Sequence, residues 1–230
     1  MDTPYAIEDY RMLSGNIHFI RIRINQDYIA LTLREVLNCL SELSWIHNFD
    51  EEYMKRSYEK RATDTINYIK ANIINGAEDN VTKDSGEYVV SVLSKKSIVD
   101  KLDYLDIPLA ELIKEKVVGN PGFDFYSENK NNIILFGEAK YLAKQNAYDS
   151  AMGQIERFIT EGKDINDIAS INSFCSKEAL SNAANGERGF IAAFSSTEIK
   201  TETLIKHIQK QDSYTNLSTH KELIFVAVTI

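Results

Sequence analysis

The pattern of apolar and polar positions changes period several times along the first 80 residues. Apolar and polar residues alternate with period two over residues 17–24, which predicts a β-strand. Apolar residues then recur at helical spacing over residues 31–45, and residues 51–73 predict a long, charged surface helix. Residues 76–86 are rich in Gly, Asn, Asp and Ser, which predicts a loop. We therefore expect residues 1–80 to form a strand, helix and helix addition, a possible partner-binding module.

From residue 81 onward the pattern is that of a compact α/β domain. The final run, LIFVAVTI at residues 223–230, is wholly apolar and is typical of a strand buried on both faces. The chain order predicts a small mixed sheet flanked by helices, of α/β or α+β class. Strands are expected at 123–126, 133–140, 189–194 and 223–230, and helices near 87–93, 107–116, 146–160 and 198–210, with a turn at 119–122.

Candidate chemistry gathers on the two middle strands. Asp124 lies on one short apolar run and Glu138 and Lys140 lie on the next, with a polar turn at residues 127–132 between them. Because strand side chains alternate faces, Glu138 and Lys140 are expected to point the same way, while the opposite face fits beneath a helix. A hairpin would bring Asp124 close to Glu138.

This combination of residues suits hydrolysis of a phosphodiester by a divalent metal. Two carboxylates bind Mg²⁺ or Mn²⁺, and a neighbouring ammonium can steer a water and offset phosphate charge. The alternative is a structural ion pair, since buried charges are costly unless they are paired or hold a metal.

The Glu-x-Lys pattern is weak by itself, because the chain contains it four times. Only the copy at Glu138 lies on a strand that looks buried. The other three are expected to be surface charges, and they begin at Glu128, Glu161 and Glu198.

Residues 86–195 resemble the PD-(D/E)xK nuclease superfamily, whose core has an Asp on one central strand and Glu-x-Lys on the next. PGFD at residues 121–124 matches the first acidic motif, and Glu138, Ala139 and Lys140 match the second. The resemblance implies a restriction-endonuclease-like core. It also implies Mg²⁺ (or Mn²⁺) held by Asp124, Glu138 and the backbone carbonyl of Ala139, with Lys140 as a catalytic residue.

The resemblance extends to two flanking positions. Gln154, on the predicted helix after the second motif, matches a glutamine frequent in the superfamily and would hold the water or a phosphate. Glu87 matches a metal-binding glutamate on the helix before the strands. Glu111 competes with Glu87 for that role, and each of these side chains can also be read as an ordinary helix surface residue.

Composition limits the class of protein. No apolar stretch is long enough to span a membrane and no signal peptide is recognisable, so the expected location is the cytoplasm, without membrane contact. Cys39 and Cys175 fit free thiols better than a disulfide framework. The four histidines show no zinc-ligand spacing with them.

The net charge of −8 and the pI near 5.1 are unusual for a protein that binds nucleic acid alone. Three basic stretches, at residues 54–61, 94–97 and 140–144, are candidate contacts, though each also fits a solvated helix surface. The acidic balance predicts either a segregated basic face or a partner that delivers the substrate.

A narrower resemblance indicates what kind of partner could deliver the substrate. The phrases DIPLAELIKEKVVGNPGFDF and LFGEAKYL resemble the HamA family, the nuclease subunits of Hachiman anti-phage defence systems. This implies an effector DNA endonuclease that works with a superfamily-two helicase (HamB-like). Two alternatives are a catalytically silent DNA-binding or scaffold subunit and a nuclease of restriction or recombination.

Overall fold

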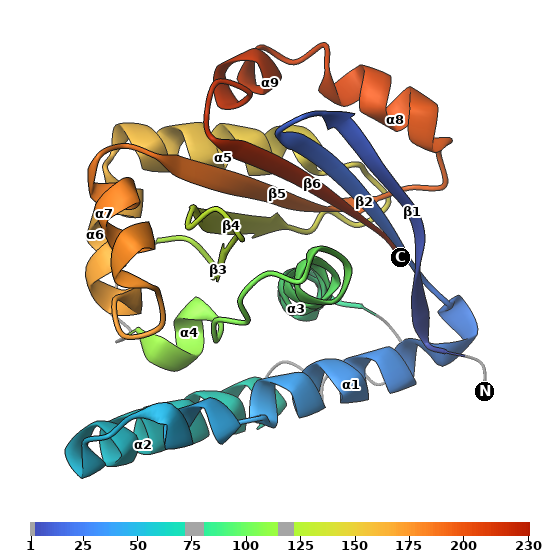
Figure 1. Cartoon of the computed structure of the whole chain (residues 1–230). Helices are drawn as coiled ribbons and strands as arrows, with labels where there is room; N and C mark the ends of the chain where they lie inside the picture. Colours follow the sequence, from blue (N-terminus) through green and yellow to red (C-terminus); the bar gives the residue numbers. More distant parts are fainter. Residues whose placement is uncertain (1–2, 72–80, 115–121) are drawn as a thin grey trace.

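A six-stranded mixed sheet forms the centre of the computed structural model, which describes residues 3–71, 81–114 and 122–230 (Figure 1). The strand order is β1-β2-β6-β5-β4-β3, and helices cover both faces of the sheet. The prediction of a mixed sheet flanked by helices is confirmed at this level. Residues 119–121 of the predicted turn and residues 76–80 of the predicted loop lie outside the described residues, and the loop prediction is wrong for residues 83–86, which belong to a helix.

Strands from the two ends of the chain are neighbours in the sheet. β1 (Tyr5–Ser14) pairs antiparallel with β2 (Ile17–Ile24), and β2 pairs parallel with β6 (Glu222–Thr229). Residues 1–80 therefore contribute two strands to the sheet that carries the candidate site, and the boundary expected near residue 80 does not separate two sheets. The partner-binding role of this region stays a prediction.

The remaining strands place the candidate site at one edge of the sheet. β6 pairs parallel with β5 (Arg188–Ser196), β5 pairs parallel with β4 (Ile134–Lys140), and β3 (Phe125–Glu128) pairs antiparallel with β4. The carboxyl ends of four parallel strands thus meet at the edge where β4 ends, a common place for ligand sites in α/β sheets. The predicted hairpin is confirmed, although Asp124 lies just before β3 and not within it.

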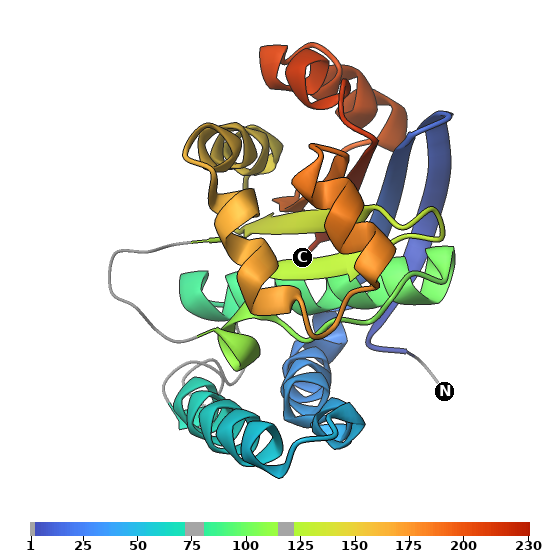
Figure 2. The same cartoon turned by 60° about the vertical axis from the view of Figure 1, so that its left-hand side comes forward.

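The helices form a layer on each face and a pair at the side. Beneath the sheet in Figure 1, α3 and α4 lie nearest to it and α1 and α2 form an outer layer. Above it lie α5, α8 and α9, while α6 and α7 pack beside β3 and β4 (Figure 2). Their bounds are α1 Ile29–Ser41, α2 Glu52–Ile69, α3 Lys83–Leu102, α4 Ala110–Ile113, α5 Tyr148–Thr160, α6 Lys163–Ile171, α7 Lys177–Ala184, α8 Thr201–Ile208 and α9 Asp212–Leu217, with 3₁₀ turns η1 Gln26–Tyr28 and η2 Ser44–Asn48.

Both faces of the sheet are buried, which explains the wholly apolar final strand. One core contains Phe136, Phe190 and Phe225 together with the apolar face of α5. The other contains Leu135 and Val226 with the apolar face of α3. Every residue of β6 is buried, so this prediction is confirmed.

Several elements differ from those expected. The helices α6, α7 and α9 were not predicted, nor was β1, an exposed and bulged edge strand without regular alternation. α3 begins four residues before the expected start, because a capping box between Thr82 and Ser85 starts it. Glu128 was expected in a polar turn, and this is wrong: it ends β3, is buried, and accepts a hydrogen bond from Ser176 N at 2.9 Å.

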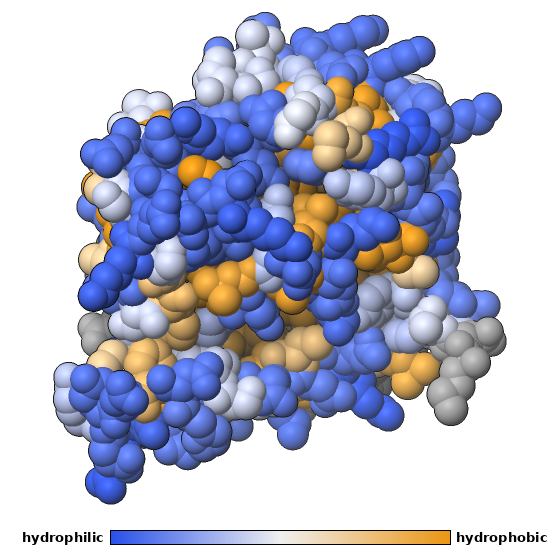
Figure 3. Space-filling view, in the orientation of Figure 1, coloured by the Kyte–Doolittle hydropathy of each residue, from blue (hydrophilic) through white to orange (hydrophobic). Residues whose placement is uncertain are grey.

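The surface of the face seen in Figure 1 is mainly hydrophilic, and hydrophobic residues gather in a band across its middle (Figure 3). Within residues 3–71, 81–114 and 122–230, no helix is both long and apolar enough to cross a bilayer. The large exposed apolar side chains are spread over several elements, which is common on protein surfaces. They are Ile7, Met12, Leu31, Tyr53, Tyr68, Leu105, Leu142 and Ile165.

Candidate active site

Asp124 is fixed to its neighbours through both its main chain and its side chain. Its N–H donates to the Gly137 carbonyl at 2.9 Å, and its carbonyl accepts from Ala110 N at 2.9 Å. Its carboxylate oxygen Oδ2 accepts from Ala139 N at 2.8 Å. Three backbone groups from β4 and α4 therefore hold the aspartate beside the end of β4.

Glu138 and Lys140 point to the same side of β4, as strand alternation predicts. The Lys140 ammonium lies 2.6 Å from Glu138 Oε1. The Glu138 side chain is only 1% exposed and that of Lys140 is 21% exposed. Between them, Ala139 faces the opposite core with Leu135 beneath α3.

Gly137 allows the close approach of β3 that brings Asp124 to this position. A Cβ atom on Gly137 would lie 2.4 Å from Cε2 of the Phe125 ring, so the ring occupies the space that a side chain would need. Gly137 thus makes room for the Phe125 side chain, which is next to Asp124 in the chain.

Burial disfavours the charged forms of both carboxylates, Asp124 and Glu138. Burial raises the pKa of Asp124 to about 6, with Glu87 and Glu111 adding to the rise and the Ala139 hydrogen bond opposing it. Burial, followed by the charge of Asp124, holds the pKa of Glu138 well above its usual value. Burial lowers the pKa of Lys140, but its ion pair with Glu138 outweighs this and raises the pKa overall.

One oxygen at this site has no partner in the part of the chain that the structure describes. Glu138 Oε1 is engaged by Lys140, whereas Glu138 Oε2 is buried without a hydrogen bond. A buried carboxylate oxygen without a partner is costly, and Asp164 Oδ1 is another such oxygen among the described residues. Glu138 Oε2 is available to a ligand that carries positive charge or a proton.

Of the two competing glutamates, Glu87 has the closer electrostatic association with the whole cluster. A cavity of about 120 Å³ is lined by Asp124, Glu87 and Glu111, together with Tyr88, Ser91 and Leu109. The charge of Glu87 acts on the pKa of Asp124, Glu138 and Lys140, and the charge of Glu111 acts on the pKa of Asp124. Glu111 also already accepts a hydrogen bond from the Tyr88 hydroxyl.

Gln154 lies on α5, the helix that follows β4, and is half-buried. Within the described residues, no hydrogen bond joins Gln154 to Glu138 or Lys140. Its catalytic role therefore stays a prediction.

Two further residues beside Asp124 could not be found from the sequence. The Lys114 ammonium lies 2.7 Å from Asp167 Oδ2, and the charges of Asp124 and Glu138 also act on the pKa of Lys114. Asp167 is on α6, which was not predicted, and no motif spacing connects it to Lys114 or to Asp124. Only the fold brings them together.

The donor set fits a divalent cation of the hard, water-retaining kind. In the described part of the chain, no group of three or more His, Cys, Asp and Glu side chains is arranged to hold a metal. Mg²⁺, however, is usually bound in proteins by one or two carboxylates and keeps several waters. Asp124 and Glu138, with the free oxygen of Glu138 and raised pKa values, match that mode.

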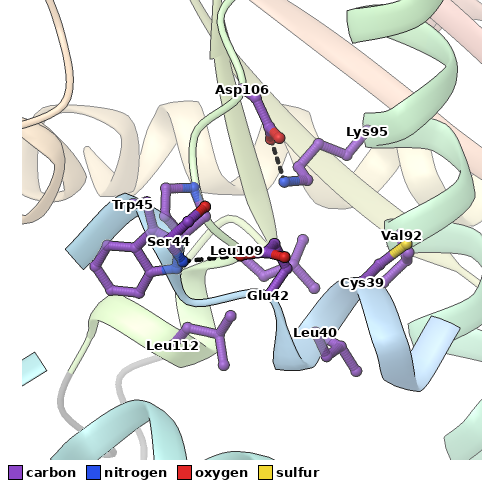
Figure 4. A pocket seen from close by; sticks show the side chains of 11 residues that line it. Cys39, Leu40, Glu42, Ser44, Trp45, Val92, Lys95, Asp106, Leu109 and Leu112 are labelled. Carbon is purple, nitrogen blue, oxygen red and sulfur yellow. Dashed lines mark hydrogen bonds and ion pairs between the residues drawn. The ribbon is translucent and has the colours of Figure 1, made fainter. Parts of the chain in front are cut away.

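A second cavity, of about 100 Å³, lies among α1, α3 and the segment before α4 (Figure 4). Lys95 and Asp106 form an ion pair beside it, and Leu40 and Leu112 contribute apolar wall. Burial raises the pKa of the Cys39 thiol, which favours its unreactive neutral form. None of the predicted site residues lines this cavity, and besides the Lys95–Asp106 pair its one other charged group among the described residues is Glu42, which accepts a hydrogen bond from Ser44 N at 2.9 Å.

The other copies of Glu-x-Lys lack the features of the Glu138 copy. Glu161 is 45% exposed and lies 3.9 Å from Lys163, and Glu198 is 64% exposed and pairs with Arg23. Both are surface charges as expected. Glu128 is buried but is hydrogen-bonded to backbone, as described above.

The chain matches no model of a known protein family, and a search of curated proteins finds no match either. Evidence for function therefore comes from the geometry around Asp124, Glu138 and Lys140 and from the resemblance of the sequence motifs.

Proposed function

We propose that this protein is a metal-dependent endonuclease that hydrolyses phosphodiester bonds of DNA. The observation that carries the proposal is the cluster of Asp124, Glu138 and Lys140 at the carboxyl edge of the sheet, with a buried oxygen of Glu138 left without a partner. The PD-(D/E)xK resemblance supports the same chemistry and names DNA as the substrate.

Each side chain has a role that follows from its position. Asp124 and Glu138 offer the hard oxygen ligands for Mg²⁺ or Mn²⁺, joined by the Ala139 carbonyl, and Glu87 is the best-placed additional carboxylate. When bound, such a cation polarises the phosphate and acidifies a coordinated water. Lys140, held at 2.6 Å by Glu138, can orient a water and offset charge that develops on the phosphoryl oxygens.

Removal of the metal tests the proposal. Purified protein is incubated with plasmid DNA and Mg²⁺ or Mn²⁺, with or without EDTA, beside a Lys140→Ala protein prepared in the same way. We expect cleavage that EDTA abolishes and that Lys140→Ala lowers by at least about a hundredfold. Equal cleavage in EDTA, or by Lys140→Ala, would contradict the assignment. DNA binding without cleavage under any metal would favour the silent subunit.

We further propose that a helicase partner delivers the DNA, as the HamA resemblance implies. Cations in two of the three basic stretches are neutralised locally: Arg56 lies 3.1 Å from Glu52, Lys60 lies 2.8 Å from Asp64, and Lys95 pairs with Asp106. Together with the net charge of −8, this leaves little attraction for a polyanion.

The partner proposal predicts a difference in DNA binding between the isolated chain and its complex. Binding is measured across a salt series for this chain alone and for its complex with the product of a neighbouring helicase gene. We expect weak binding by the chain alone and much tighter binding by the complex. Tight, steeply salt-dependent DNA binding by the isolated chain would contradict the proposal that a partner delivers the DNA.

A further inference from the structure

A single carboxylate oxygen collects three donors from the segments around Asp124. Asp167 Oδ2 accepts hydrogen bonds from Phe123 N at 3.0 Å and from the Tyr126 hydroxyl at 2.7 Å. The Lys114 ammonium lies 2.7 Å from the same oxygen. Asp167 is 7% exposed, so these are enclosed, charge-assisted contacts of the stronger kind.

Two of the three donors to Asp167 come from residues on either side of Asp124 in the chain. Phe123 precedes Asp124 in the chain, and Tyr126 lies two residues after it on β3. Asp124 itself is bonded to the backbone of β4, at Gly137 and Ala139. The Asp124 segment is therefore held between β4 on one side and the α6 carboxylate on the other.

Gly122 shows how closely this segment approaches α6. A Cβ atom on Gly122 would lie 2.5 Å from Lys114 Nζ and 2.7 Å from Asp167 Oδ1. A side chain at this position would displace the Lys114 ammonium or the Asp167 carboxylate. The absence of a side chain at Gly122 therefore leaves room for the Lys114–Asp167 pair.

The charges of this cluster are linked to those of the site. Asp167 pairs with Lys114, and Lys114 in turn lies within the electrostatic reach of both Asp124 and Glu138. Loss of the Asp167 charge would weaken the hydrogen bonds from Phe123 N and the Tyr126 hydroxyl and release Lys114 to turn toward the site carboxylates. Both changes would disturb the ligand geometry.

We propose that Asp167 is the positioning residue of the metal site: through Phe123, Tyr126 and Lys114 it fixes the Asp124 carboxylate where Glu138 can share a divalent cation. The inference rests on the proposed nuclease function. Groups that orient metal ligands typically account for about ten- to a hundredfold in metal affinity.

The test measures Mn²⁺ binding by full-length protein, following free Mn²⁺ by electron paramagnetic resonance, together with thermal unfolding in EDTA. The variants are Asp167→Asn, Asp124→Asn and a matched control, Asp164→Asn. Asp164 is on the same helix and its side chain is 1% exposed. It pairs with Arg188, the first residue of β5, which lies at the opposite end of the parallel strands from Lys140.

We expect Asp167→Asn to weaken Mn²⁺ binding at least about tenfold and Asp164→Asn to leave it unchanged, even where both lower the melting temperature. If Asp167→Asn binds Mn²⁺ as tightly as wild type while Asp124→Asn does not, the positioning role of Asp167 is wrong and the metal site itself stands. Wild-type affinity in Asp124→Asn would overturn the metal site and the inference with it.

A milder variant covers failure of Asp167→Asn to fold. Tyr126→Phe removes one of the three donors and keeps the ring in the core. We expect about threefold weaker Mn²⁺ binding, equivalent to the loss of one hydrogen bond. Unchanged Mn²⁺ affinity in Tyr126→Phe, beside lost affinity in Asp124→Asn, would count against the positioning role.

Discussion

Replacement of Glu138 by glutamine is expected to lower metal-dependent DNA cleavage by about a thousandfold or more, equivalent to about 4 kcal/mol of transition-state stabilisation. Glutamine keeps the shape of the side chain but removes the negative charge that a divalent cation needs. It also removes the partner that holds Lys140 at 2.6 Å. Single-turnover cleavage rates with saturating Mg²⁺ measure the effect.

The chain supplies its own matched control for this experiment. Glu161 belongs to another Glu-x-Lys sequence and faces Lys163 at 3.9 Å, but it is 45% exposed. Glu161→Gln is expected to cut DNA at the wild-type rate. If the two glutamine variants lost activity equally, or Glu138→Gln kept the wild-type rate, the site would be misassigned.

Replacement of Asp124 by asparagine is expected to stabilise the metal-free protein at pH 8 by about 1–3 kcal/mol, while it abolishes cleavage. Asparagine retains an oxygen that can accept from Ala139 N and removes a charge that burial disfavours. A pKa raised from about 4 to about 6 corresponds to a cost of this order in the ionised state. Urea unfolding of both proteins in EDTA measures the difference.

The pH dependence of that difference has a definite sign. Below pH 4 the carboxyl of Asp124 is protonated in both the folded and the unfolded chain, so the variant gains nothing from the lost charge. Between pH 4 and pH 6 the folded state keeps a proton that the unfolded state releases, and wild-type stability falls as pH rises. Above pH 6 the cost is complete and the advantage of Asp124→Asn is largest.

Added Mn²⁺ should reverse the order of stability. A cation that binds only the folded state stabilises wild type by mass action, and Asp124→Asn loses that gain. If Asp124→Asn were less stable than wild type at pH 8 in EDTA, the charge of Asp124 would not destabilise the folded protein.

The strands that carry the site could be predicted because their patterns depend on local geometry. Residues 133–136 are an apolar run that leads into Glu138 and Lys140, and period-two alternation alone places those two side chains together. β6 was predictable because burial on both faces favours apolar residues, which fill all of it except its two ends, Glu222 and Thr229. The nuclease activity, the metal and the helicase partner stay predictions.

The missed elements have polar residues where an apolar pattern would be needed. α6 buries Asp164 and Asp167 along with Ile171, so its inward face does not read as hydrophobic. Its carboxylates are tolerated because Arg188 and Lys114 pair with them, and those partners are distant in sequence. β1 has one neighbour, two bulges and many exposed residues, which removes the alternation that marks a strand.

The place of β6 in the sheet bears on synthesis of the protein. β6 alone connects β2 to β5, so a chain that stops before residue 222 contains Asp124, Glu138 and Lys140 but has β5 as an open edge and two unjoined parts of a sheet. Such a chain cannot complete the core that holds the site in place. A chain truncated before β6 is therefore expected to lack the assembled cluster of Asp124, Glu138 and Lys140.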